Sequence, residues 1–193
     1  VTLKICMSLD GMIFNEKSRS SLIGDLKQLR HSNNLRTNYD SILVGVETIL
    51  ADNPKLTYRG LGSKSLKQPR PIVLDSLLRT PLDSKIIKLK NNPIIFTNLD
   101  EDSRKSVKLK KLGCTIIKLK KLEPRMVLKS LVKNNLQTVM VEGGGSIFTS
   151  FLKSNSYDEL ILYYSTIFIG NSGLNLGHSL DKEYKLKKDS AKI

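Results

Sequence analysis

Short apolar runs alternate with amphipathic segments along most of the chain. The runs are rich in Val, Ile and Leu, which is typical of strands that a sheet buries on both faces. Their polar neighbours act as boundaries, because Gly, Asp, Asn and Pro cluster where the runs end. The predicted strands are Val1–Ser8, Ser41–Gly45, Pro71–Asp75, Ile94–Thr97, Thr115–Leu119, Thr138–Val141, Glu159–Phe168 and Tyr184–Lys188.

The segments between the strands carry helix signals. Gly113 is a typical helix stop, Pro124 a typical helix start, and Asp52-Asn53-Pro54 ends a helical turn. The predicted helical segments are Asp25–Thr37, in which Leu26, Leu29, Asn33 and Arg36 share a face, Val46–Ala51, Asp102–Leu112, Arg125–Asn134 and Ser146–Lys153. Strands that alternate with helices predict an α/β fold, with a mainly parallel central sheet flanked by helices.

The chain shows no internal repeat and no long linker. The polar segment Gly60–Arg70 is predicted to be an exposed loop, and it is too short to separate two domains. We therefore expect one domain over residues 1–193. Ligands of open α/β sheets bind beyond the carboxyl ends of the strands, so polar residues that follow strands are the candidate site residues.

The strongest such signal is the segment Val139–Ser146, in which a strand runs into Gly143, Gly144 and Gly145 before a helix. Glycines let a ligand approach the backbone closely, and a helix N-terminus favours phosphate. A tight turn is the alternative explanation. Glu142 ends the strand, either as a carboxylate in the same crevice or as a helix-capping or surface residue.

Two further strand ends carry polar residues. Thr48 and Asp52 follow Ser41–Gly45 and share a helix face, where they either hold amide or ribose groups of a cofactor or cap the helix. Arg59 is a candidate phosphate ligand. Ser76 follows Pro71–Asp75 as a phosphate donor, and Arg79 faces either a 2′-phosphate or solvent. Asp10-Gly11 predicts a tight turn.

Composition narrows the function classes. The formal net charge is +14, and it is carried by dispersed lysines rather than by an aromatic-interleaved RNA-binding motif. A solvated Lys-rich surface is the favoured explanation, attraction of anionic ligands the second, and nucleic acid a distant third. No apolar run approaches the roughly 20 residues that span a bilayer. The two cysteines and two histidines are too scattered for a zinc site, and we expect reduced thiols.

Taken in order, four motifs resemble one family: Ser-Leu-Asp-Gly at Ser8–Gly11, the segment Ile42–Thr57, Ile-Val-Leu-Asp-Ser at Ile72–Ser76, and Val-Glu-Gly-Gly-Gly at Val141–Gly145. The chain is similar to the riboflavin-pathway pyrimidine reductases. The resemblance implies a dihydrofolate-reductase-like fold, NADPH as cofactor, a phosphorylated pyrimidine substrate, a homodimer and a cytoplasmic location. The implied reaction reduces a ribosylamino side chain to a ribitylamino group.

The resemblance also assigns site residues by position, with no metal and no identified proton donor. It places Cys6, Thr48, Asp52, Ser76, Gly143, Gly144, Gly145 and Ser146 at the cofactor, with Met7 near the nicotinamide. On the substrate side it places Ser21 (or Ser20), Arg36, Leu56, Arg59 and Glu142, the arginines as phosphate ligands.

Two departures from the family bear on the prediction. The family ends in a glycine-bearing edge strand, whereas this chain ends in a Lys-rich segment, so the C-terminal edge is in doubt. The zinc deaminase motif of the bifunctional enzymes does not occur in the sequence, which favours the stand-alone archaeal or fungal type. The lack of an initial Met suggests that a short N-terminal piece is missing.

Three rival functions remain open: a reductase of the deaminated uracil compound, a dihydrofolate reductase, and a basic RNA-binding module. The chain has no Trp and no recognisable early-helix carboxylate for pterin protonation, which counts against dihydrofolate reductase. An RNA-binding module predicts salt-sensitive nucleic acid binding without NADPH binding.

Overall fold

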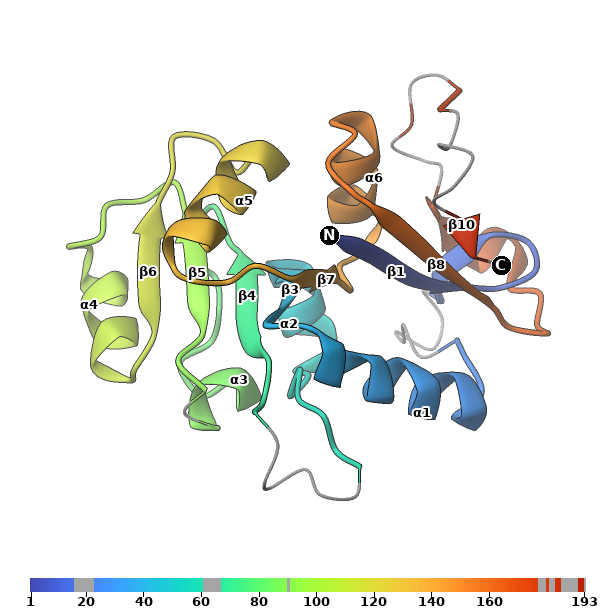
Figure 1. Ribbon diagram of the computed structural model, residues 1–193, viewed down its shortest axis with the longest axis horizontal. Coiled ribbons are helices and arrows are strands. Elements are labelled where there is room, and N and C mark those ends of the chain that lie inside the picture. The colour runs from blue at the N-terminus through green and yellow to red at the C-terminus, as the bar shows by residue number, and fades with distance from the viewer. Residues whose placement is uncertain are drawn as a thin grey trace.

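The computed structural model describes residues 1–15, 23–60, 67–89, 91–176, 180, 183–184 and 191–192. One sheet of eight strands has the order β10-β8-β1-β7-β3-β4-β5-β6, and every pairing recorded within it is parallel (Figure 1). The prediction of an α/β fold with a mainly parallel sheet is confirmed. The strands are β1 (Thr2–Met7), β3 (Ser41–Gly45), β4 (Arg70–Leu74), β5 (Ile94–Thr97), β6 (Thr115–Lys118), β7 (Val139–Val141), β8 (Glu159–Tyr164) and β10 (Ala191–Lys192).

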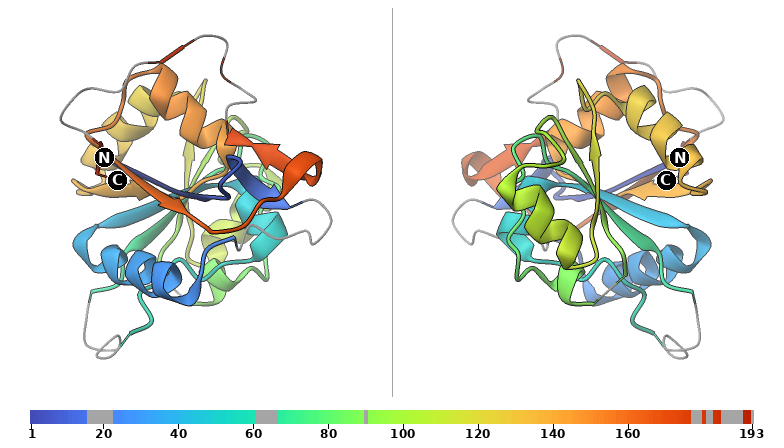
Figure 2. Two further views of the ribbon diagram at one scale, coloured as in Figure 1. Left: turned by 90° about the vertical axis from the view of Figure 1, so that its right-hand side faces the viewer. Right: turned by 90° about the vertical axis from the view of Figure 1, so that its left-hand side faces the viewer.

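Helices cover both faces of this sheet (Figure 2). They are α1 (Leu26–Leu35), α2 (Val46–Asp52), α3 (Lys85–Lys88), α4 (Arg104–Lys111), α5 (Pro124–Lys133) and α6 (Gly145–Lys153), with short 3₁₀ turns at Arg36–Asn38 and Gly170–Ser172. A separate antiparallel pair, β2 (Met12–Asn15) with β9 (Gly173–Asn175), lies beyond the main sheet.

The pleat of the strands divides the apolar side chains between two cores. In β3, Leu43 faces the core under α5 and α6, whereas Ile42 and Val44 face the core under α2, α3 and α4. All three side chains are fully buried. Because both faces are covered, β3 is apolar at successive positions instead of alternating, as the sequence pattern predicted.

Strand β1 departs from this pattern, and the departure creates the polar floor of the site. Leu3, Ile5 and Met7 pack in the core under α5 and α6, so Thr2, Lys4 and Cys6 face the opposite side, toward α1. In the described part of the chain, the second core contains no residue of β1. Helix α1 therefore covers a polar strip of sheet.

Helix α1 has a matching polar face. Within α1, Ser32 is the one buried residue, while Leu26 and Leu29 are both exposed. The shared face predicted for these two leucines is thus not a core face, because the sheet beneath α1 offers polar groups that need hydrogen-bond partners. The helix begins at a capping box, in which Asp25 accepts from the Gln28 backbone N–H.

Two predicted strands near the C-terminus differ from the structure by more than one residue. β8 ends at Tyr164 rather than Phe168, because the chain turns to meet the Asp10 carboxylate, which accepts hydrogen bonds from the N–H groups of Ile169 and Gly170. Those bonds, with one from the Ser8 hydroxyl, lower the pKa of Asp10. Of the predicted strand Tyr184–Lys188, Tyr184 lies outside any strand, and residues 185–188 are outside the described residues. The sheet edge is formed by β10 beside β8.

The tight turn predicted at Asp10-Gly11 is present. Gly11 has a φ of 78°, a left-handed conformation that favours glycine, and its N–H donates to the Ser8 carbonyl. Strand β2, which follows at once, was not predicted. The segment predicted as a loop, Gly60–Arg70, lies partly outside the described residues and gives way to β4 at Arg70.

The connection after β4 is held by one buried carboxylate. Asp75 is fully buried and accepts hydrogen bonds from the Arg79 N–H at 2.8 Å and from both the N–H and the hydroxyl of Thr80 at 2.7 Å. Leu78 is buried between them at a φ of 52°, a conformation that non-glycine residues rarely adopt. The Asp75 bonds therefore set the position of Ser76 and Arg79.

We predict that Asp75→Ala destabilises the protein by about 3 kcal/mol, since it leaves two buried donors of Thr80 and the partly buried N–H of Arg79 without their acceptor. The expected decrease in Tm is roughly 5–10 °C for a chain of this size. Thermal unfolding followed by circular dichroism measures it. The exposed Asp83 of the same connection is the matched control, and Asp83→Ala should change the free energy of unfolding by less than about 0.5 kcal/mol. Equal melting curves for the two variants would contradict the role given to Asp75.

Candidate active site

A crevice of about 470 Å³ opens at the carboxyl ends of β1, β3 and β7. It lies where ligands bind in open α/β sheets. Side chains from distant parts of the chain meet there, with α1 and α2 forming its walls. The predicted site residues that line it are Cys6, Arg36, Thr48, Asp52, Leu56, Arg59, Glu142, Gly143 and Gly144.

A second cavity of about 310 Å³ adjoins the first, because Thr48 and Gly144 line both. Ser76, Ser146 and Arg79 line this second cavity. The structure thus divides the predicted residues between two joined spaces. A wider depression beside Asp100–Ser103 lies at the β6 end of the sheet, is open to solvent, and involves none of them.

Three predicted residues fall elsewhere. Gly145 is buried and is absent from the described residues that line the two cavities. Met7 is buried in the core beneath α6. Ser21, with the alternative Ser20, lies outside the described residues. The site roles of these residues, and of those in the cavities, remain predictions.

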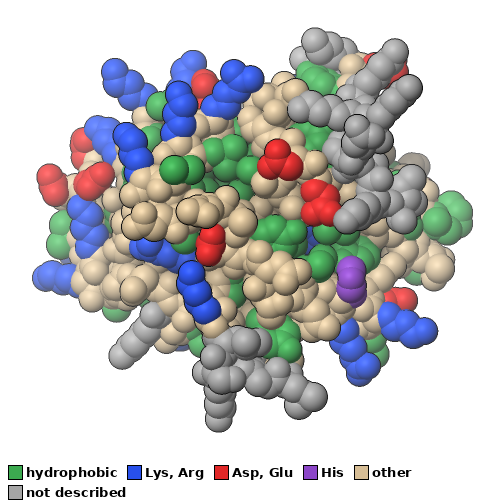
Figure 3. Space-filling view, viewed as in Figure 1, with side chains coloured by type: hydrophobic (Ala, Val, Ile, Leu, Met, Phe, Trp, Pro, Cys, Tyr) green, Lys and Arg blue, Asp and Glu red, His purple; other side chains and the backbone are tan. Residues whose placement is uncertain are grey.

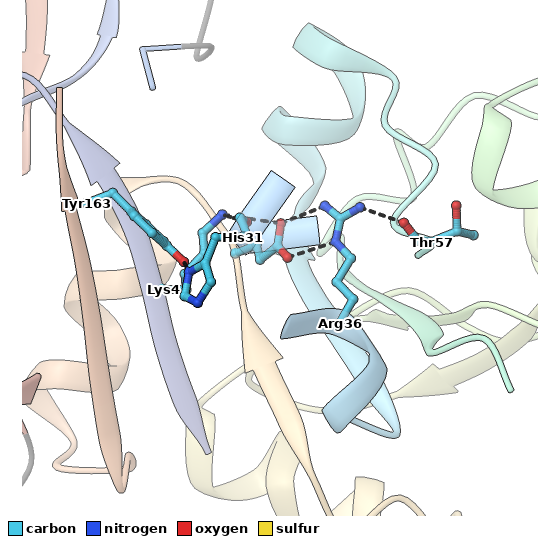
Figure 4. Close-up of polar contacts among 7 residues, drawn as sticks. Lys4, His31, Arg36, Thr57 and Tyr163 are labelled. Carbon is cyan, nitrogen blue, oxygen red and sulfur yellow. Dashed lines mark hydrogen bonds and ion pairs between the residues drawn. The ribbon is translucent and has the colours of Figure 1, made fainter. Parts of the chain in front are cut away.

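The electrostatic centre of the crevice is Glu142, whose side chain is only 8% exposed. Arg36 binds it through two parallel bonds, Nε to Oε1 at 2.9 Å and Nη2 to Oε2 at 2.8 Å. The remaining Arg36 nitrogen, Nη1, donates to the Thr57 carbonyl at 2.9 Å. Lys4 Nζ lies 3.7 Å from Oε2 on the other side (Figure 4). Arg36 was predicted to bind phosphate, but here its guanidinium holds this carboxylate.

Burial of the Glu142 carboxyl would raise its pKa, because a low-dielectric environment disfavours the charge. The Lys4 ammonium and the hydrogen bonds from Arg36 outweigh burial and lower the pKa to about 2. Glu142 is therefore an anion at neutral pH, held between two cations whose side chains are 11% and 13% exposed. A buried carboxylate needs at least one cationic partner, and here Arg36 and Lys4 together leave the three groups with a net positive charge.

Lys4 is a site residue that the sequence-based prediction missed. Its ammonium donates to Ser32 Oγ at 2.7 Å, and it lines both the crevice and a side pocket of about 100 Å³. The signal was available, since a lysine within a buried strand must find acceptors. Only the fold shows that those acceptors come from α1 and β7.

The same side pocket contains Tyr163 of β8, a second residue that was missed. Lys4 Nζ lies 6.0 Å from the centre of the Tyr163 ring, and the Tyr163 hydroxyl lies 2.6 Å from Nδ1 of His31 (Figure 4). Burial, with the nearby Glu142 charge, raises the pKa of Tyr163 to about 12. The Cys6 thiol lies in the same pocket, and burial raises its pKa. The positive charge of Lys4 opposes this effect in part. Both groups are thus neutral at physiological pH.

The three glycines at the start of α6 differ in what surrounds them. A Cβ on Gly143 would lie 2.9 Å from Ile147 Cβ, and one on Gly145 would lie 2.9 Å from Ile13 Cδ1, so both positions are closed by packing. A Cβ on Gly144 would meet nothing within 4 Å, because this residue faces the junction of the two cavities. Gly144 is also the N-cap of α6, and no side chain caps that helix end. This helix end borders the cavity through Gly144 and Ser146, and backbone N–H groups at a helix N-terminus favour an anion.

Charged residues elsewhere are dispersed. Figure 3 shows Lys and Arg side chains around the margin of one face, most densely near α5. The last turn of α4 carries Lys108, Lys110 and Lys111. Several exposed lysines pair with acidic side chains, among them Lys110 with Glu101. Each helix in the described part of the chain is too short or too polar to span a bilayer.

Comparison with known proteins identifies the family of this chain. The family model described as the RibD C-terminal domain matches residues 1–192. The chain belongs to the RibD C-terminal domain family. Among curated members it is 32% identical to the riboflavin biosynthesis protein RibD of Aquifex aeolicus, over 97% of this chain and 53% of that protein. It is also 32% identical to the 2,5-diamino-6-ribosylamino-4(3H)-pyrimidinone 5′-phosphate reductase of Archaeoglobus fulgidus, over 97% of this chain and 89% of that protein.

This RibD-family chain spans about half the length of the RibD proteins that it matches. Among solved structures it is similar to Acinetobacter baumannii RibD, with a TM-score of 0.82 and 24% identity over 95% of this chain and 50% of that one. It is similar to the riboflavin biosynthesis reductase of Saccharomyces cerevisiae, with a TM-score of 0.73 and 25% identity over 91% and 76%. The predicted dihydrofolate-reductase-like fold and the predicted family are confirmed.

We predict that Glu142→Gln destabilises the protein at pH 7 and that the difference from the original protein disappears in acid. The folded-state pKa of Glu142 is depressed to about 2. The contribution of the Glu142 charge to the free energy of unfolding is therefore complete above the pKa of the unfolded state, near 4.3, and is lost as the pH falls toward 2. The expected loss is about 3 kcal/mol. Urea unfolding of both proteins between pH 7 and pH 2.5 measures it, and a difference that stays constant with pH contradicts it.

Proposed function

We propose that this protein is an NADPH-dependent reductase of riboflavin biosynthesis. Its substrate is the phosphorylated 2,5-diamino-6-ribosylaminopyrimidinone, whose ribosylamino side chain it reduces to a ribitylamino group. One observation carries the proposal: the crevice with the buried Glu142 charge cluster is continuous with a cavity at the uncapped N-terminus of α6. The names of the family relatives agree with this activity.

The residues present fit an extended dinucleotide. Gly144, Ser146 and the first turn of α6 would hold its pyrophosphate, since this helix end lacks a side-chain cap and Gly144 leaves space for the ligand. Thr48 and Asp52, on one face of α2, would bind the carboxamide and ribose hydroxyls. Ser76 and Arg79 line the far cavity, where the 2′-phosphate would lie. When bound, NADPH supplies a hydride to C1′ of the sugar.

The chain's own residues would orient the pyrimidine against this cofactor. Glu142 is an anionic acceptor suited to the substrate's amino groups, and Lys4 is a donor suited to its carbonyl oxygen. Leu56, buried at a φ of 53°, forms an apolar wall of the crevice. Arg59 lies exposed at the rim, where it would bind the 5′-phosphate. Catalysis then rests on orientation within a crevice of fixed charge.

A second candidate substrate is the deaminated uracil compound. One similar structure, from Thermotoga maritima, carries the name of a 5-amino-6-(5-phosphoribosylamino)uracil reductase, at 27% identity over 91% of this chain and 46% of that one. The two substrates differ where an amino group replaces a carbonyl oxygen. The Glu142 carboxylate favours the amino group, because it accepts hydrogen bonds and donates none.

We predict that the purified protein oxidises NADPH with the diaminopyrimidine substrate, and that Gly144→Val abolishes this by blocking the junction of the cavities. The Kd for NADPH should rise at least about tenfold, whereas Tm should fall by only a few degrees, because the valine enters open space and replaces a glycine N-cap. Nicotinamide absorbance measures turnover, and nicotinamide fluorescence measures binding. Parallel assays use the deaminated uracil compound and dihydrofolate. Turnover of dihydrofolate alone, or unchanged NADPH affinity in the variant, would overturn the proposal.

We further propose that the protein works as a cytoplasmic homodimer. Exposed apolar side chains support a contact with a second copy: Phe168 is 76% exposed, and Leu9, whose N–H donates to the Ile167 carbonyl, and Ile167 itself are also exposed. A patch of this kind on one surface is typical of interaction sites. Cys6 and Cys114 are free thiols, which suits a reducing compartment.

We predict that Phe168→Asp converts the dimer to a monomer, because a charge at the centre of an apolar contact must be desolvated on association. Sedimentation velocity of both proteins at the same concentration measures the change. Leu112→Asp, at an exposed apolar position on the far side of the sheet beyond α4, is the control and should leave the mass unchanged. A monomeric original protein contradicts the dimer.

A further inference from the structure

We propose that Glu47 and Arg79 together set the preference of this protein between NADPH and NADH, an inference that rests on the proposed function. Arg79 Nη2 and Glu47 Oε1 form an ion pair at the second cavity, and both residues line it. A guanidinium suits a 2′-phosphate, whereas a carboxylate suits the free 2′-hydroxyl of NADH. At the second cavity, one guanidinium and one carboxylate are in contact with each other.

The lining residues of the second cavity support this assignment. Gly144 and Thr48 line its junction with the crevice, and Ser146 lies at the N-terminus of α6, where a pyrophosphate would bind. Beyond them, Leu74, Leu122 and Ile147 give the second cavity apolar walls suited to an adenosine. The Glu47–Arg79 pair lines the same cavity and brings the only charged side chains among its described lining residues.

Arg79 is held in place through its backbone. Its N–H donates to the buried Asp75 carboxylate at 2.8 Å, and Leu78 before it is buried in the core. The guanidinium itself remains 45% exposed, on a fixed backbone. Arg79 is thus positioned to receive an anion without any rearrangement of the loop.

Glu47 competes for that guanidinium. It lies in the first turn of α2, and its side chain is 74% exposed, so the ion pair is largely solvated and contributes little to stability. A 2′-phosphate must displace Glu47 from Arg79 and then bind beside a like charge, both of which weaken NADPH binding. With NADH, the pair stays intact and Glu47 accepts a hydrogen bond from the ribose. Glu47 therefore moderates a preference for NADPH that Arg79 alone would make strong.

The experiment compares the Kd values of NADPH and NADH, and of the fragments 2′,5′-ADP and 5′-AMP, for four proteins by isothermal titration calorimetry. Glu47→Gln should bind NADPH and 2′,5′-ADP about fivefold more tightly, with NADH unchanged or weaker. Arg79→Gln should bind NADPH and 2′,5′-ADP about tenfold more weakly, with NADH and 5′-AMP within twofold. Asp158→Asn, which removes the same charge at an exposed position just before β8, is the control and should change none of these values.

The fragments report on the adenosine end without any turnover, so this test is separate from the activity assay. If the original protein is folded and binds neither NADPH nor NADH, the proposed function itself fails. If it binds both, but Glu47→Gln leaves the ratio of the two Kd values within twofold, Glu47 only stabilises the start of α2 and the inference is overturned. A ratio that Asp158→Asn shifts equally shows that net charge alone decides it, which also overturns the inference.

Discussion

The anion at Glu142, enclosed by Lys4 and Arg36, is the constraint on which the rest of the site depends. A carboxylate this deeply buried is stable only beside cations, and Arg36 compensates it through two hydrogen bonds while Lys4 lies 3.7 Å away on the other side. The three residues come from β7, β1 and the turn after α1. Their pairing therefore fixes the distance between the sheet and the helix that forms one wall of the crevice. The same Glu142 carboxylate is the group proposed to bind the substrate.

Helix α1 is the element that this cluster holds. It is attached to the sheet mostly by polar contacts, of which the Ser32–Lys4, His31–Tyr163 and Gln28–Tyr164 bonds are examples. Hydrogen bonds are directional, whereas apolar packing tolerates sliding, so a polar attachment sets the position of a wall more strictly. Its free-energy contribution is modest, because each bond replaces bonds to water. The stability of the fold comes instead from the two apolar cores on either side of β3, β4 and β5.

The two joined cavities divide the work between backbone and side chains. In the proposed function, recognition at the α6 end would rely on backbone N–H groups of the uncapped helix end and on the missing side chain of Gly144, features that suit any pyrophosphate. At the Glu142 end and at the Glu47–Arg79 pair, it relies on charges of defined position. Under this proposal, general affinity for a dinucleotide and selectivity between chemically similar ligands would come from different parts of the two joined cavities.

The sequence by itself determined the order along the chain of β1, of β3 to β8 and of the helices α1, α2, α4, α5 and α6, since β-branched runs between Gly, Pro and Asp boundaries have few alternatives, and β3 and β5 have the predicted bounds. The short elements β2, β9, β10 and α3 were not predicted. The motifs of the sequence also indicated residues that line the two cavities, because Thr48, Glu142 and Gly144 lie within three residues of a strand end. Only the tertiary structure decided what those residues contact. Lys4, Tyr163 and the pairing of Arg36 with Glu142 escaped prediction because each depends on groups more than 25 positions away in the chain. Local patterns report the conformation of the backbone, whereas the partner of a buried charge is chosen by the packing of the whole sheet.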